Sequence, residues 1–296
     1  FLNNCISSTF LVDEVSKKPA KRYAPAPFTT STLQQESSRK LSFSVSKTMS
    51  VAQRLYEAGH ITYMRTDSVN LSSIAIDKAQ EFITTQFGKI YSNPKNYSVK
   101  SKNAQQAHEA IRPTDFFLNQ DSIADYDQKR LYNLILNRTI ASQMKEAEIE
   151  KTNVKILSSS NQEVFTAIGE VIKFDGFLKI YSVSKENDVE ESKGILPNLD
   201  VKDKIELVKM TGTQRFTKPP FRFSEASLVK RLEELGIGRP STYAPTISTI
   251  QNRGYIEKGT NEAKLRDIDQ IILCNGKIEK NIINEKYGSN KGKLVP

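Results

Sequence analysis

The stretch His60-Ile61-Thr62-Tyr63-Met64-Arg65-Thr66-Asp67-Ser68 follows a helix-forming run that ends at a glycine. Side chains of an extended segment point alternately to opposite sides, so Tyr63, Arg65 and Asp67 would share one face, with Met64 on the other. A phenol has a pKa of about 10 and is a weak nucleophile at neutral pH unless a cation stabilises the phenolate. Arg65 would supply that cation or hold a phosphate under attack. An amphipathic strand with a half-buried Tyr63 would give the same pattern without any chemistry.

A second polar stretch is Gln105-Gln106-Ala107-His108-Glu109-Ala110-Ile111-Arg112-Pro113-Thr114. The four-residue spacing predicts that His108 and Arg112 lie on one helix face, just before Pro113 ends the helix. An imidazole beside an arginine suits a phosphate or a leaving oxygen. An ordinary helix end is the alternative. The chain has only 2 histidines, so a metal site built from a histidine cluster is not expected.

A third candidate is Arg239-Pro240-Ser241-Thr242-Tyr243, where a tight turn leads into a helix. Backbone amides at a helix N-terminus, two hydroxyls and an arginine would together bind an anion, and Arg253 adds a cation at the far end of the helix. Simple capping of the helix by Ser241 is the alternative reading.

Around these stretches the sequence pattern alternates between segments typical of helices and segments typical of strands. A strand is expected over residues 9–18, followed by a basic, proline-rich linker over 17–27. Helices are expected from Ser31, from Ser46 to Gly59, and over residues 72–87 and 126–147. Residues 150–218 read as an all-β insert of balanced charge, with strands at 154–157, 164–172, 177–183 and 205–210.

Patterns typical of helices return after Pro219-Pro220. Residues 225–235 and 241–253 would form two helices over a short turn, with Ser224 capping the first and a strand starting at Tyr255. That order is the pattern of a winged helix-turn-helix, which often binds nucleic acid, although helical hairpins also serve only for packing.

The composition limits the classes of protein to consider. The 296 residues carry a net charge of +9, which indicates either a nucleic-acid partner or simply a basic protein. No apolar run approaches the ~20 residues of a membrane span, and the start lacks the basic region of a signal peptide. The 2 cysteines match no zinc or disulfide pattern, so a reducing, cytoplasmic compartment is expected. Because the chain does not begin with Met, we interpret it as a piece of a longer protein.

Several stretches, in this order, resemble bacterial topoisomerase I within the type IA DNA topoisomerase family. They are Pro27-Phe28-Thr29-Thr30-Ser31-Thr32-Leu33-Gln34-Gln35, Ile61-Thr62-Tyr63-Met64-Arg65-Thr66-Asp67-Ser68, Ala107-His108-Glu109-Ala110-Ile111-Arg112-Pro113, Phe223-Ser224-Glu225-Ala226-Ser227-Leu228-Val229, Gly236-Ile237-Gly238-Arg239-Pro240-Ser241-Thr242-Tyr243-Ala244 and Ile250-Gln251-Asn252-Arg253-Gly254-Tyr255. The resemblance covers residues from about 10 to 258. Met64 between the tyrosine and the arginine is similar to topoisomerase I rather than to the topoisomerase III branch.

The resemblance implies an enzyme, an isomerase that cleaves single-stranded DNA through a 5′-phosphotyrosine link, passes a strand, religates and relaxes negative supercoils without ATP. It implies that Tyr63 is the nucleophile, that Arg65 stabilises the phosphate and that His108 assists. Single-stranded or negatively supercoiled DNA would be bound by the side chains of Arg112, Arg239, Ser241, Thr242 and Arg253. The resemblance also implies a monomer of the bacterial cytoplasm and nucleoid with no membrane partner.

The expected fold is an α+β multidomain arrangement. A helical gate domain (residues 23–149) carries the tyrosine and is inserted in an antiparallel β arch (1–22 and 150–218). A truncated, winged-helix-like helical domain (219–296) follows. In the family, an N-terminal Toprim domain binds Mg²⁺ and supplies a general-acid glutamate; no part of it is recognisable here, and no metal ligands are expected within the chain. We therefore expect the chain alone to relax DNA poorly or not at all, because lost metal and acid remove electrostatic stabilisation.

Two other classes fit parts of the sequence. A non-catalytic module that binds single-stranded DNA would keep the same fold and would not need Tyr63. A tyrosine recombinase would place several arginines and histidines before a tyrosine near the end of its domain, whereas Tyr63 comes early.

Overall fold

The computed structural model describes residues 1–97, 109–160, 163–182 and 196–296. Its α-helices are α1 (Leu2–Cys5), α2 (Thr30–Leu41), α3 (Val45–Glu57), α4 (Ser73–Phe87), α5 (Tyr126–Ser142), α6 (Glu225–Glu234) and α7 (Tyr243–Asn252), and its 3-10 turns are η1 (Lys89–Tyr91), η2 (Gln120–Ser122) and η3 (Gly176–Lys179). Its strands are β1 (Phe10–Arg22), β2 (Ala147–Ser158), β3 (Val164–Phe174), β4 (Lys204–Ile205), β5 (Lys209–Thr213), β6 (Glu257–Lys258), β7 (Lys264–Cys274), β8 (Lys277–Tyr287) and β9 (Leu294–Val295). In this described part of the chain, no helix is long and apolar enough to cross a membrane.

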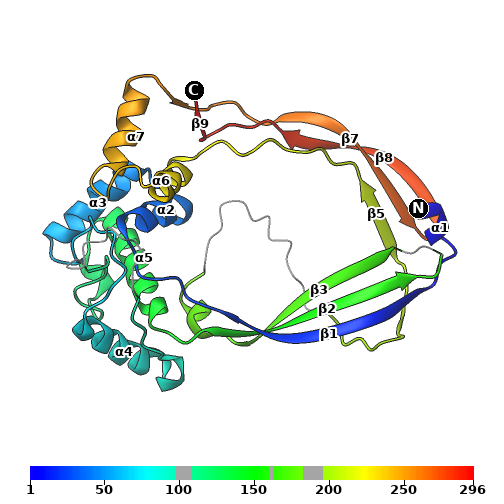
Figure 1. Ribbon diagram of the computed structural model, residues 1–296, viewed down its shortest axis with the longest axis horizontal. Helices are drawn as coiled ribbons and strands as arrows, with labels where there is room; N and C mark the ends of the chain where they lie inside the picture. Colours follow the sequence, from blue (N-terminus) through cyan, green and yellow to red (C-terminus); the bar gives the residue numbers. More distant parts are fainter. Residues whose placement is uncertain (98–108, 161–162, 183–195) are drawn as a thin grey trace.

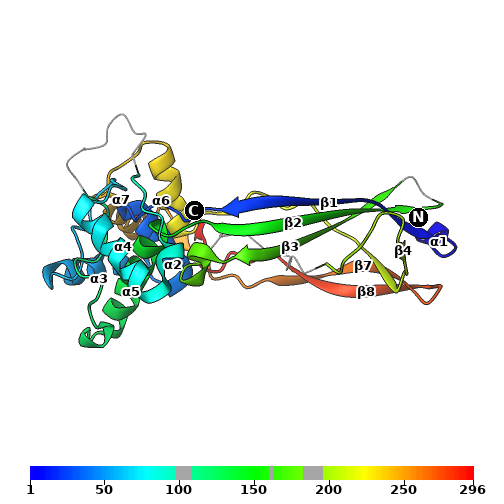
Figure 2. The same ribbon diagram turned by 90° about the horizontal axis from the view of Figure 1, so that it is seen from below.

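The elements follow a ring (Figure 1). Helices α2 to α7 gather at one end, and two groups of strands run from them to the opposite end, where α1 and the N-terminus lie. Seen from below, the same strands run along the long axis of the molecule (Figure 2). The architecture is therefore a mixed α and β arrangement in which the strands form the sides of the ring.

The helices start and stop where local capping chemistry directs them. Helix α4 begins after Ser72, whose hydroxyl accepts the amide of Ala75, and it ends at Gly88, as predicted. Helix α6 begins after Ser224 in a capping box with Ser227. Helix α2 begins slightly earlier than expected, because Thr29 rather than Ser31 is its N-cap.

The main apolar core lies within the helical end of the ring, among α2, α3, α4 and α5. Phe177 and Tyr181, which follow β3, are buried in the same core. The predicted strand over residues 177–183 is wrong for its described part, since Gly176–Lys179 forms η3. The apolar pattern that suggested a strand instead serves to attach the β arch to the helical core.

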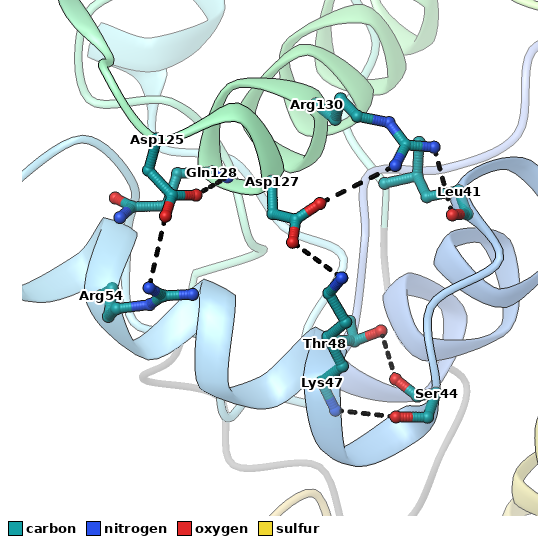
Figure 3. Close-up of polar contacts among 9 residues, drawn as sticks. All are labelled: Leu41, Ser44, Lys47, Thr48, Arg54, Asp125, Asp127, Gln128 and Arg130. Atoms are coloured by element: carbon teal, nitrogen blue, oxygen red, sulfur yellow. Dashed lines mark hydrogen bonds and ion pairs between the residues drawn. The ribbon is translucent and has the colours of Figure 1, made fainter.

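Polar contacts fix α3 against α5 at the surface of this core (Figure 3). Lys47 of α3 contacts the carboxylate of Asp127 of α5 at 2.7 Å, and Arg130, also of α5, lies 3.8 Å from the same carboxylate. Arg54 lies 3.4 Å from Asp125, the N-cap of α5. The stretch that begins at His60 follows α3 directly, so these contacts hold the helix that precedes the candidate site.

One side of the ring is an antiparallel sheet in the order β3-β2-β1-β4. Strand β1 continues to Arg22, so the predicted linker over residues 17–27 is wrong for its first part. Pro19 lies within this strand, opposite Glu150 of β2. A proline is tolerated there because β4 pairs only with Phe10 and Leu11, which leaves the other edge of β1 without a neighbouring strand at Pro19.

The other side of the ring is a sheet in the order β5-β7-β8. A hairpin turn at Asn275 and Gly276, with φ of 50° and 71°, joins β7 to β8, as a type I′ turn requires. The expectation of helical structure up to residue 296 is therefore wrong for residues 264–287, where alternating charged and β-branched residues form this hairpin. The sequence predicts a strand that starts at Tyr255 after the second helix. Strand β6 does follow α7, and it pairs with β9.

Two seams close the ring. At the arch end, Cys5 of α1, Phe10 of β1 and Leu273 of β7 form an apolar cluster. There the chain itself crosses between the sheets, since only residues 206–208 separate β4 from β5. At the helical end, α6 packs on α2 and α7 packs on α3. Glu225 of α6 accepts the backbone N–H of Val45, the first residue of α3, at 2.9 Å.

Candidate active site

Tyr63 and Arg65 lie on the exposed side of the segment that follows α3. The burial alternates along this segment, with Met64 and Thr66 buried between the exposed Tyr63 and Arg65, and with Asp67 partly exposed. The segment does not join a sheet, but the predicted separation into two faces is present. Met64 and Thr66 pack inside the protein, whereas the side chains of Tyr63 and Arg65 are accessible to a substrate.

The N-terminus of α2 holds the segment on one side of the tyrosine. The hydroxyl of Thr30 donates to the carbonyl oxygen of Met64 at 2.7 Å and accepts the N–H of Thr66 at 2.8 Å. The N–H of Thr30 also donates to the carbonyl oxygen of Thr66 at 2.9 Å. These buried hydrogen bonds leave little freedom for the backbone around Arg65.

Residues 110–112 hold the segment on the other side. The hydroxyl of Thr62 donates to the carbonyl oxygen of Ala110 at 2.7 Å and accepts the N–H of Arg112 at 3.0 Å. The N–H of Thr62 donates in turn to the carbonyl oxygen of Arg112 at 2.9 Å. Tyr63 therefore lies between two backbone anchors, so its phenol is presented from a rigid support.

Arg112 lies in an extended stretch rather than on a helix face, so the predicted helix is wrong at this residue. Ile111 and Pro113 instead form bridges with Phe28 and Ile61. The residue before a proline is biased away from helical backbone, which explains the difference.

The guanidinium of Arg112 is engaged within the protein. Its Nε and one terminal nitrogen donate to both carboxylate oxygens of Glu109 at 2.8 Å, and the other terminal nitrogen donates to the carbonyl oxygen of Pro113 at 2.9 Å. Burial alone would raise the pKa of Glu109, but hydrogen bonds from Arg112 and Ser72 outweigh it and lower that pKa. This geometry favours a role in holding residues 109–113, and DNA contact by Arg112 stays a prediction. His108 lies outside the described residues.

Arg239, Ser241 and Thr242 lie exposed at the turn between α6 and α7. The hydroxyl of Thr242 accepts the N–H of Arg239 at 2.8 Å, which closes the turn. Helix α7 starts at Tyr243 with no side-chain cap, so Ser241 does not cap it. Arg253 is exposed at the C-terminal end of α7, and the two arginines therefore lie at opposite ends of one helix.

The α6–α7 pair reaches the candidate site through Glu233. The hydroxyl of Ser31, buried in α2, donates to a carboxylate oxygen of Glu233 at 2.7 Å. Glu233 as a whole is exposed, but this end of its side chain faces inward, and the loss of water there raises its pKa. Glu234 and Asp67 raise the pKa of Glu233 further, while the bond from Ser31 lowers it.

Tyr243 of α7 lies in the same neighbourhood. Burial raises the pKa of the Tyr243 phenol, and Glu233 and Asp67 add to this effect, whereas Arg239 opposes it. The groups that meet at this seam therefore include Asp67 from the tyrosine segment, Glu233 from α6 and Arg239 from the turn. The structure thus brings the first and third predicted stretches into one neighbourhood.

Two residues near the site were not predicted from the sequence. Glu233 belongs to an amphipathic helix whose partner surface is not apparent locally. Tyr56, on the last turn of α3, lies with its ring centroid 5.2 Å from that of Tyr63. Seven positions separate the two tyrosines in the sequence, and no periodicity in the segment that follows α3 would have paired them. Within the described residues, no group of His, Cys, Asp and Glu side chains is arranged to hold a metal ion.

The chain combines a helical unit and a β arch joined in a ring, with an exposed tyrosine and an exposed arginine beside one seam. A family model described as DNA topoisomerase matches residues 1–286. The chain belongs to this family, and the sequence-based recognition of a type IA topoisomerase is confirmed.

Relatives and a solved structure agree with this assignment. The chain is 48% identical over 257 residues to DNA topoisomerase 1 of Zymomonas mobilis, covering 84% of this chain and 21% of that protein. It is 43% identical over 302 residues to DNA topoisomerase 1 of Helicobacter pylori, covering 97% of this chain and 40% of that protein. The structure of full-length topoisomerase I from Thermotoga maritima superposes with a TM-score of 0.74 at 37% identity, covering 87% of this chain and 43% of that one. The chain therefore spans less than half the length of these relatives.

Proposed function

We propose that this chain carries the nucleophile of a type IA DNA topoisomerase and that Tyr63 is that nucleophile. The phenolic oxygen of Tyr63 attacks the phosphorus of a phosphodiester in single-stranded DNA and forms a bond to the 5′ phosphate. The bond from phosphorus to the 3′ oxygen breaks, and the departing 3′ hydroxyl takes up a proton. Religation reverses these steps, so the energy of the phosphodiester is retained and no ATP is needed.

The single observation that carries this proposal is the double anchoring of an exposed tyrosine. A tyrosine that served only packing would have no need of hydrogen-bonded backbone anchors on both sides together with an outward phenol. Arg65 shares the exposed face two residues on, where its charge would stabilise the phenolate and the attacked phosphate. His108 is proposed to assist the proton transfer.

The remaining predicted residues extend the site along a DNA strand. Arg239 and Arg253 would contact phosphates from the two ends of α7, with Ser241 and Thr242 donating from the turn. Arg112 stays in the proposed DNA-binding set, although its charge is already paired with Glu109. After cleavage the second strand would pass through the ring as the seam between α6 and α2 opens, and negative supercoils would relax.

Magnesium belongs to the proposal for the whole enzyme, in which it would supply electrostatic stabilisation of the transferred phosphate. The resemblance places its ligands in a Toprim domain outside this chain. We propose that the protein acts as a monomer on chromosomal DNA in the bacterial cytoplasm. The weak relaxation activity expected of the 296-residue chain alone stays a prediction.

The test is covalent capture of a single-stranded oligonucleotide labelled at its 3′ end, because the 3′ fragment is the one that stays joined to the protein. The chain is mixed with Mg²⁺ and with the magnesium-binding segment of a topoisomerase 1 relative, and the reaction is stopped with denaturant. We expect a labelled protein adduct that is lost in Tyr63→Phe. Tyr287→Phe is the matched control, because Tyr287 is 40% exposed and Tyr63 is 42% exposed.

The two variants separate the catalytic proposal from the non-catalytic module. An adduct that persists in Tyr63→Phe, or the absence of any adduct in the wild type while DNA is bound, would contradict the catalytic role of Tyr63. The second result would favour the single-strand binding module instead.

A further inference from the structure

Tyr56 is a second exposed tyrosine directly beside the proposed nucleophile. Its ring lies 5.2 Å from the ring of Tyr63 at an interplanar angle of 67°, and 40% of its surface is exposed. In an edge-on pair of this kind, only one of the two rings offers a face to the other. Whichever ring does so, Tyr56 keeps at least one face that Tyr63 does not cover.

Tyr56 is mounted on a rigid part of the fold. It lies on the last turn of α3, next to Leu55, which is fully buried in the helical core. Its carbonyl oxygen accepts the N–H of Gly59 at 2.9 Å, where a φ of 75° ends the helix. The contact between Arg54 and Asp125 ties the same turn to α5 (Figure 3). A flat apolar face is therefore held in a fixed position at the surface.

An exposed aromatic face beside a residue that attacks phosphate has an obvious chemical complement in a nucleobase. Every base offers a π face, so aromatic side chains bind single-stranded nucleic acid with little sequence preference. In a bound strand, a base and the phosphate of the same nucleotide are neighbours, as the rings of Tyr56 and Tyr63 are. Stacking one base would therefore place the adjoining phosphate near the phenol of Tyr63.

We propose that Tyr56 is a stacking platform for the nucleobase next to the phosphate that Tyr63 attacks. This inference rests on the proposed function, since it takes Tyr63 as the nucleophile. Tyr56 then acts as a positioning residue that sets which phosphate reaches the phenol, while Tyr63 forms the bond. Its hydroxyl is not required, so phenylalanine would serve as well as tyrosine.

The chain contains no tryptophan, which gives a direct probe. Tyr56→Trp introduces the only indole, and its fluorescence should be quenched when a single-stranded oligonucleotide stacks on it. Tyr287→Trp on β8 is the control, because Tyr287 is equally exposed at 40%. Both are made with Tyr63→Phe, so that no covalent step contributes, and binding is followed separately by the anisotropy of a dye on the DNA.

A second measurement removes the base instead of the side chain. Oligonucleotides with one abasic site moved along the strand are bound to three proteins: the Tyr63→Phe chain, and the same chain with Tyr56→Phe or Tyr56→Leu added. We expect one abasic position to weaken binding about tenfold when position 56 is aromatic. The same position should have no effect in Tyr56→Leu.

The outcomes distinguish this inference from the proposed function. Quenching at position 56 alone, with an abasic effect that disappears in Tyr56→Leu, supports the platform. Normal binding with no quenching, or equal abasic effects in all three proteins, overturns the platform and leaves the proposed function intact. Absence of any DNA binding by anisotropy overturns both.

Discussion

Within the described residues, both seams of the ring contain an apolar cluster, but the backbone crosses only the seam at the arch end. At the arch end, Cys5, Phe10 and Leu273 pack as an apolar cluster, and residues 206–208 carry the chain from one sheet to the other. At the helical end, Glu233 and Glu225 of α6 reach the N-terminal turns of α2 and α3 through single hydrogen bonds. The helical seam also has an apolar cluster, in which Val45, Val229, Tyr243 and Ile247 are buried.

This difference shows which seam is able to part. The arch end cannot separate without unfolding, because the backbone itself crosses it. No such crossing exists at the helical end within the described residues, where α6 packs on α2, α7 packs on α3, and Glu225 accepts the backbone N–H of Val45. Opening at the helical seam would also uncover the surroundings of Tyr63. The proposed nucleophile thus lies beside the contact that could separate.

The largest expected effect comes from damaging the arch seam. Leu273 is 1% exposed, so Leu273→Ala should lower the free energy of unfolding by about 2–5 kcal/mol through lost burial and a cavity. Urea unfolding followed by circular dichroism measures it. Leu265→Ala on the same strand is the control, because Leu265 is 61% exposed and should cost less than about 0.5 kcal/mol. Equal losses in the two variants would mean that the arch cluster is not a stabilising seam.

A smaller effect is expected at the helical seam from Glu225. Burial would raise its pKa, but Lys258, the N–H of Val45 and Gln251 lower it below the ordinary value of 4.5. Glu225→Gln removes a charge from the N-terminus of α3 and should weaken docking by about 1–2 kcal/mol, leaving the arch intact.

Energy transfer between dyes on the two sides of the seam measures this docking. Cysteines introduced as Ile74→Cys on α4 and Thr249→Cys on α7 report the separation, in a chain in which Cys274 is serine and Cys5, which is 1% exposed, is left in place. Glu234→Gln is the control on the same helix, since the Glu234 side chain is 48% exposed. If Glu234→Gln opens the seam as much as Glu225→Gln, general charge rather than the helix N-terminus is responsible.

The smallest effect is expected from Glu233, whose charge should weaken docking at the helical seam, whereas the charge of Glu225 strengthens it. Its pKa in the docked state is raised above 4.5, so the docked form binds the proton more tightly and docking weakens as the pH rises through that raised pKa. Glu225 behaves in the reverse way, because its contribution is present above 4.5 and is lost as the pH falls below that value. The seam should therefore be tightest near pH 4.5.

Energy transfer between the dyes at positions 74 and 249 tests whether the charge of Glu233 weakens docking. Glu233→Gln should close the seam slightly at pH 7 and remove the weakening between mildly acidic and neutral pH, with a smaller change than Glu225→Gln produces. A seam that opens in Glu233→Gln at pH 7 would show that the charge of Glu233 supports docking, contrary to this prediction.

The sequence predicted those parts of the molecule that local chemistry controls. The caps at Ser72 and Ser224 mark the starts of α4 and α6, and alternation separates Tyr63 from Met64. Predictions failed where a distant partner decides the conformation. Phe177 leaves the expected strand to join the helical core, and the extended backbone that Pro113 favours at Arg112 is held by bridges to remote segments.

The rest of the site depends on contacts between residues far apart in the chain. Glu233 meets Ser31 across more than half of the sequence, and nothing local in either helix predicts that meeting. Tyr56 is near Tyr63 only because Gly59 turns the chain back after α3. Local patterns can therefore indicate a candidate nucleophile, whereas its surroundings follow from the closure of the ring.

The short crossing at residues 206–208 has a consequence for how the opened ring would close again. Because the two sides stay joined in one polypeptide, reclosure is a unimolecular event whose rate does not depend on the amount of protein. The tether gives α6 an effective concentration near α2 that two separate proteins would not reach in a cell. A seam that rests on the Glu225 carboxylate and one apolar cluster is then sufficient, and it can be weak enough to release.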